Sequence, residues 1–70
     1  MTRAVTIMVN GESREIPEGS KVSALLVQLE YKPERVAIER NRKVLPRALW
    51  DVTQVQSGDH FEIVHFVGGG

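Results

Sequence analysis

Alternating apolar and polar positions open the chain and predict a β-hairpin. Over Ala4–Val9, every second residue is β-branched and apolar, as expected for a strand with one buried face. Asn10 and Gly11 follow, and this pair favours a tight turn because both residues tolerate a positive φ. We therefore expect Glu12–Ile16 to return antiparallel and to end at Pro17.

The next apolar positions recur with the period of an α-helix. They lie on one stripe and comprise Val22, Leu25, Leu26 and Leu29. Ser20 is the expected N-cap, because its hydroxyl can accept a hydrogen bond from the first unpaired amides. Pro33 should stop the helix, although Glu30 stands at the exit where a glycine is usual. One helix of this size can cover one face of a small sheet.

Shorter elements follow the helix. Arg35–Arg40 alternates and predicts a third strand, and Lys43–Leu45 predicts a short fourth strand after a turn at Asn41-Arg42. Pro46 has no N–H to give to a ladder, so it marks a strand end or edge. The stretch 46–50 predicts one helical turn in which Leu49 and Trp50 are partly buried.

The last predicted strand runs from His60 to Val67, after a tight turn at Ser57-Gly58-Asp59. Its alternation places Phe61, Ile63 and His65 on one face and leaves Val64 and Phe66 on the other. The two histidines, His60 and His65, then point to opposite faces, which disfavours a shared metal site.

These elements predict an α+β domain, with a mixed four- to five-stranded sheet and one helix packed across one face. The opposite face stays open and would be polar if it only met water. Val64 and Phe66 are expected there, with Ala37 beside them, so we interpret this face as a docking surface.

Composition narrows the function. The chain has 70 residues, enough for one small domain, which we place at residues 1–66, with residues 67–70 as a flexible tail. Nine basic and nine acidic residues cancel, which disfavours attraction of the whole domain to nucleic acid or to an anionic membrane. The absence of cysteine excludes a disulfide or a cysteine nucleophile, and the sequence suggests neither catalytic nor metal-binding residues. We expect a cytoplasmic protein with no membrane segment.

The tail Gly68–Gly70 contributes no side chain to a core. It ends in an α-carboxylate on a slim strip of backbone that can enter a narrow enzyme channel. Glycine has no stereocentre, so activation of this carboxyl group cannot racemise it. The alternative explanation for three such residues is a flexible end with no role.

The chain as a whole resembles the ubiquitin-like β-grasp sulfur carriers, and among them the ThiS family of thiamine biosynthesis. The motifs that carry the resemblance are Val9–Glu12, Val36–Asn41, Val44–Arg47 followed by Trp50, Ser57–Asp59 and Glu62–Gly70. The most specific part of the resemblance is the pair Pro46-Arg47 with Trp50 after it, at this spacing from the final glycines. Two departures, Glu30 and Arg42, stand where the family commonly has glycine, and both concern turns.

The resemblance implies a protein co-substrate rather than an enzyme. The carboxylate of Gly70 would be adenylated by an E1-like activating enzyme that uses ATP, with no cofactor bound by the carrier itself. A sulfur donor protein would then convert it to a thiocarboxylate, which donates sulfur to thiazole synthase. Val64, Phe66, Val67 and Ala37 would bind these partners, and Arg40 and Arg47 would steer acidic surfaces towards them.

Three alternatives stay open at this point. The small sulfur-carrier subunit of molybdopterin synthase has the same fold and chemistry. Such subunits tend to carry prolines before the tail, whereas residues 64–67 of this chain contain none, which favours the thiamine branch. A ubiquitin-like modifier is less compatible with so short a chain. A β-grasp module that binds protein or RNA without carrying sulfur is the third, since five cations fall within residues 35–47, but few aromatic residues are left to stack on bases.

Overall fold

The computed structural model describes residues 3–66, so the expected tail 67–70 lies outside the described residues. The elements in chain order are β1 (Ala4–Val9), β2 (Glu12–Pro17), α1 (Val22–Gln28), η1 (Pro33–Arg35), β3 (Val36–Arg40), β4 (Lys43–Val44), η2 (Arg47–Leu49) and β5 (His60–His65). Two of them, η1 and η2, are single 3₁₀ turns. Every strand and the helix expected from the sequence is present.

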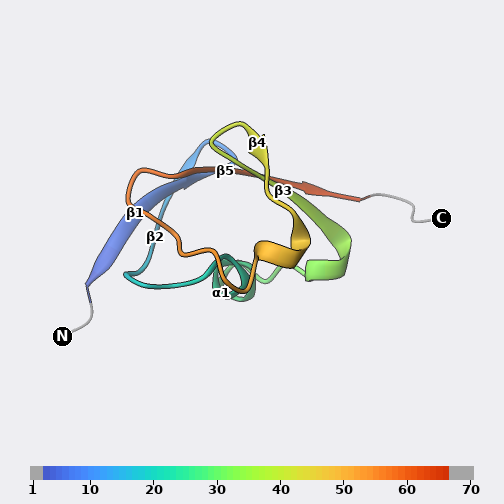
Figure 1. The fold of residues 1–70 in the computed structure, drawn as a ribbon. Helices are drawn as coiled ribbons and strands as arrows, with labels where there is room; N and C mark the ends of the chain where they lie inside the picture. The colour runs from blue at the N-terminus through green and yellow to red at the C-terminus, as the bar shows by residue number, and fades with distance from the viewer. Residues whose placement is uncertain (1–2, 67–70) are drawn as a thin grey trace.

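The five strands form one mixed sheet in the order β2-β1-β5-β3-β4. β1 and β5 are parallel, and all other neighbours are antiparallel. The last strand therefore lies in the middle of the sheet, between the first and the third. Helix α1 covers one face, and the segment after η2 lies beside it on the same side (Figure 1). This arrangement confirms the predicted β-grasp fold.

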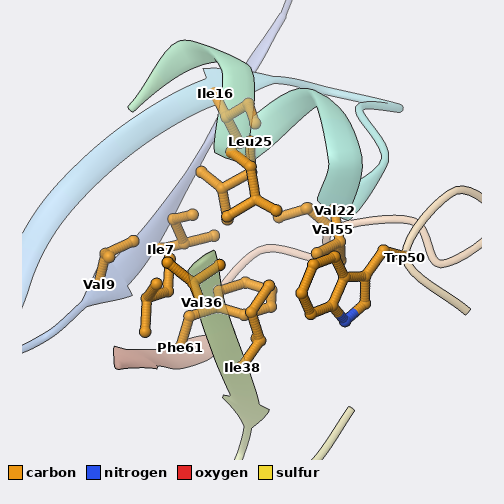
Figure 2. Packing of buried hydrophobic residues seen from close by; sticks show 12 residues of the cluster. Ile7, Val9, Ile16, Val22, Leu25, Val36, Ile38, Trp50, Val55 and Phe61 are labelled. Atoms are coloured by element: carbon orange, nitrogen blue, oxygen red, sulfur yellow. The ribbon is translucent and has the colours of Figure 1, made fainter. Parts of the chain in front are cut away.

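The core lies between the sheet and α1 (Figure 2). Its buried members are Ile7, Val9, Ile16, Val22, Leu25, Leu26, Val36, Ile38, Trp50, Val55, Phe61 and Ile63. The helical stripe supplies three of these side chains, and the inward positions of all strands but the short β4 supply most of the others. Burial of side chains of this size is worth about 1.5–3 kcal/mol each, so packing of the sheet against α1 is the main source of stability.

The start of α1 differs from the prediction. Lys21 is the N-cap, and no side chain caps the helix. The Ser20 hydroxyl instead donates to the carbonyl of Pro17 at 2.6 Å, within the turn that leaves β2. The prediction of Ser20 as the N-cap is therefore wrong, because the helix begins one residue later and its first amides, those of Val22 and Ser23, donate to the carbonyls of Thr53 and Trp50.

The helix ends in a Schellman motif without glycine. The Glu30 N–H donates to the carbonyl of Val27, and the Tyr31 N–H donates to that of Leu26. Glu30 takes the left-handed conformation that this motif requires, with φ of 63°. The β3–β4 turn makes the same demand of Asn41 and Arg42, whose φ values are 52° and 72°.

The partial burial predicted for Leu49 and Trp50 is wrong for both residues. Trp50 is only 4% exposed, so it is a core residue rather than a partly buried one. Its indole N–H donates to the carbonyl of Leu45 at 2.9 Å, which satisfies its one polar atom. Leu49 stays 45% exposed.

The strands begin or end a residue or two away from the predicted bounds. β3 starts at Val36 because Arg35 closes η1, and β5 ends at His65 rather than Val67, the last predicted strand residue, which is outside the described range. Pairing nevertheless continues one step further, since the Phe66 N–H donates to the carbonyl of Arg35 at 2.8 Å.

Candidate functional site

Four exposed apolar side chains share the open face of the sheet, on the side away from α1. Val64 on β5 pairs with Ala37 on β3. Val44 on β4 pairs with Glu39, which is two residues after Ala37 on β3 and therefore on the same face. Phe66 follows Val64 in the same alternation. We name Ala37, Val44, Val64 and Phe66 the open-face patch.

The members of the open-face patch are strongly exposed for apolar residues. Val44, Val64 and Phe66 are 74%, 58% and 54% exposed. The alternate residues of β5, Phe61 and Ile63, are buried in the core and fix the strand's register. The outward orientation predicted for Val64 and Phe66 is therefore observed, and the patch has the character of a surface that is covered on binding.

The Asn10 side chain holds β5 where β1 ends. Its amide nitrogen donates to the carbonyl of Ile63 at 3.2 Å, and its amide oxygen accepts the Ile63 N–H at 2.8 Å. The side chain thus makes the two hydrogen bonds to β5 that the backbone of one further β1 residue would make. The turn residue Asn10 thus also fixes the strand that leads to the open-face patch.

Arg47, predicted to steer partners, has three contacts within the domain. Its guanidinium group donates to the carbonyl of Pro33, and to the carbonyl of Val36 at 3.2 Å. It also stacks over Trp50, with its central carbon 4.7 Å from the ring centroid. The group satisfies one carbonyl of η1 and one of β3, beyond the end of the short β4, so its first role is structural.

Arg40, the other predicted steering residue, pairs with a buried carboxylate. Its Nε donates to Asp59 at 3.0 Å, and the two side chains are 28% and 6% exposed. Asp59 also accepts the Asn41 side-chain amide at 3.2 Å and the Gln56 N–H at 2.8 Å. This network ties the β3–β4 turn to the start of β5, and Asp59 partly neutralises the charge of Arg40.

A shallow hollow of about 360 Å³ lies where β5 ends. It is lined by Glu30, Lys32, Arg35, His65 and Phe66, two of them cationic. The His65 ring meets Tyr31 edge to face, with centroids 5.7 Å apart. At Phe66 the open-face patch therefore adjoins a hollow that has two cationic side chains and one acidic side chain.

Two kinds of feature are absent from the described residues. Within residues 3–66, no group of three His, Asp or Glu side chains gathers closely enough to hold a metal ion. No helix in the same range is long and apolar enough to cross a membrane. What this part of the chain presents is a surface beside a chain end.

Comparison with known families decides the identity. The ThiS family model matches residues 7–70, which is nearly the whole chain and includes the three glycines. The chain belongs to the ThiS family.

Individual ThiS relatives agree. The chain is 30% identical to the sulfur carrier protein ThiS of Escherichia coli, over 91% of this chain and 97% of that one. A crystal structure of the thiamine biosynthesis protein ThiS from Geobacter metallireducens superposes with a TM-score of 0.80, at 36% identity, and covers 94% of this chain and all of that one.

A longer relative has a different name. The chain is 41% identical to part of a thiazole synthase from Magnetococcus marinus, over 91% of this chain. The chain spans about a fifth of the length of the thiazole synthases that it matches. In those proteins, a ThiS-like segment is joined to a much larger remainder.

Some predicted site residues of this ThiS-family chain are outside the described range, and some residues of the observed site were not predicted. Gly68, Gly69, Gly70 and Val67 are outside the described residues. Val44 was not predicted, because a two-residue strand is too short for alternation to show which side chain faces outward. The second role of Asn10 was also missed, since the Asn-Gly pair already explained its presence.

Proposed function

We propose that this chain carries sulfur on the carboxyl group of Gly70 for thiazole formation. The observation that carries the proposal is the family match through residue 70, which includes the glycines after the open-face patch. A glycine carboxylate becomes reactive only after one oxygen is turned into a leaving group. Adenylation by an E1-like enzyme with ATP does this and releases pyrophosphate. A sulfur donor protein then displaces AMP and leaves a thiocarboxylate.

The proposed acceptor of this sulfur is thiazole synthase. Proteins of that name contain a segment similar to this chain, so the two functions occur together in one polypeptide. We propose that the open-face patch, with Val67, binds the activating enzyme and thiazole synthase in turn. Both enzymes must take in the same tail, which starts directly beside the patch.

The arginines have a smaller part in this proposal. Arg47 keeps its charge while it caps β3, so it can attract an acidic partner from a distance. The charge of Arg40 is partly neutralised by Asp59. We therefore assign long-range steering to Arg47 more than to Arg40.

Intact-mass spectrometry tests the proposal. The chain is incubated with its activating enzyme, ATP and a sulfur donor, and conversion of the carboxylate should add about 16 Da. The matched control is the same chain without Gly70, which should keep its mass. A wild-type chain that gains no mass in the complete mixture would contradict the proposal, as would an equal gain in the control.

A further inference from the structure

The edges of this sheet are protected in different ways, and at His65 we find no such protection within residues 3–66. A strand edge exposes unpaired N–H and C=O groups that attract another strand, so proteins usually block them. The side chain of Asn10 blocks β5 at Ile63, and Arg47 blocks β3 at Val36. The Gln28 side chain likewise covers the outer edge of β2, by donating to the carbonyl of Glu15 at 2.9 Å.

The outer strands carry charges as further protection. β2 presents an exposed ion pair, Arg14 with Glu12 at 3.2 Å, along its length. β4 has only two residues and follows Arg42 directly, with Lys43 as its first residue. Charged side chains and very short strands both discourage pairing with a foreign strand.

His65 has no such protection. Ile63 directs its N–H and C=O towards Asn10, and backbone groups two residues apart on a strand point the same way. The N–H and C=O of His65 therefore face the β1 side, beyond the point where β1 and Asn10 end. Neither group has a hydrogen-bond partner within residues 3–66.

The neighbours of His65 make this edge attractive rather than repulsive. Val64 and Phe66 flank it, and both are exposed and apolar. Figure 1 shows β5 (red) continuing towards the C-terminus past the end of β1. The open-face patch and the free edge are thus continuous, and both lie where the tail begins.

We propose that the free edge of β5 at His65 pairs with an extended segment of thiazole synthase. The segment would lie on the β1 side of β5, accept a hydrogen bond from the His65 N–H and donate one to its C=O. Its outward side chains would extend the apolar surface at Val64 and Phe66. Because strand pairing fixes direction and register together, it would align the tail before the tail enters the enzyme. This inference rests on the function proposed above.

The test removes one N–H and leaves the rest of the strand intact. In His65→Pro the ring eliminates this donor, and proline is tolerated on a strand where the N–H faces away from the sheet. The matched control, His65→Ala, keeps the N–H but removes the imidazole and its contact with Tyr31. A synthetic chain with N-methylated His65 keeps the imidazole and provides the second test, should proline disturb the fold.

Affinity for purified thiazole synthase is measured by calorimetry for the full-length variants. The expected result is a Kd at least about tenfold weaker for His65→Pro and for the N-methylated chain than for His65→Ala and wild type, since the partner's carbonyl loses its donor. Equal affinity across all four chains would overturn strand pairing. Intact-mass gain in the same wild-type preparation shows separately whether the sulfur-carrier function holds.

Two other outcomes also overturn the inference. Light scattering could show a wild-type dimer that His65→Pro converts to a monomer, in which case the edge belongs to a second copy of this chain. Wild-type chain that gains sulfur but does not bind thiazole synthase would show that the acceptor, and with it the proposed strand partner, is a different protein.

Discussion

Phe66→Ala measures how much the open-face patch contributes to binding. Complete burial of a phenylalanine side chain is worth about 1.5–3 kcal/mol. Phe66 is 54% exposed in the free domain, so docking can bury roughly half of it and gain about 0.8–1.6 kcal/mol. We therefore expect the Kd for thiazole synthase to rise about 4- to 15-fold. Titration calorimetry with the purified enzyme measures this change.

The structure also supplies a matched control for this substitution. Val27 is 74% exposed on α1, on the opposite face of the domain, so Val27→Ala removes an even more exposed apolar group without changing the patch. Its affinity should equal that of wild type. Phe66→Ala should lower Tm by no more than about 10 °C, because just under half of the side chain is buried in the free domain. Unchanged affinity with a much larger fall in Tm would show that Phe66 serves the fold, and the reasoning would fail.

Three further changes test the network and the tail. Asp59→Asn removes the charge that Arg40 needs, so stability should fall by about 2 kcal/mol, seen as a Tm lower by roughly 8–16 °C; a change under 2 °C would contradict this. Asn10→Asp keeps a residue that tolerates positive φ but loses the donor to Ile63, and chemical denaturation should show a loss of about 1–2 kcal/mol. A midpoint equal to wild type would refute that role. Deletion of Gly68–Gly70 should leave Tm unchanged and abolish the mass gain, and a clear fall in Tm would mean that the glycines pack against the domain.

The strands were predictable because each carries its own periodic signal. The hairpin at 4–17 and the two faces of β5 follow from alternation together with turn residues, which are local properties of the sequence. The buried stripe of α1 was equally readable. These elements, with the exposed positions Val64 and Phe66, account for the fold and for most of the open-face patch.

Contacts between distant segments were not predictable from local patterns. Asp59 reads as an ordinary turn residue until Arg40, nineteen positions earlier, lies beside it. Arg47 reads as a free surface cation, yet its position after the proline directs it to carbonyls of η1 and β3. The failed cap at Ser20 has a related cause, since the first amides of the helix donate to carbonyls of the distant residues Thr53 and Trp50, which no local pattern shows.

The left-handed residues Glu30 and Arg42 bear on how this domain could evolve. A residue with a side chain pays roughly 1–2 kcal/mol for this conformation, whereas glycine adopts it freely but loses more entropy on folding. Both turns border the proposed docking surface, since Arg42 is two residues before Val44 and Glu30 lines the same hollow as Phe66. A descendant lineage in a hotter habitat that replaced either residue with glycine would therefore change the edge of that surface as well. Stability and docking are selected together at these two turns.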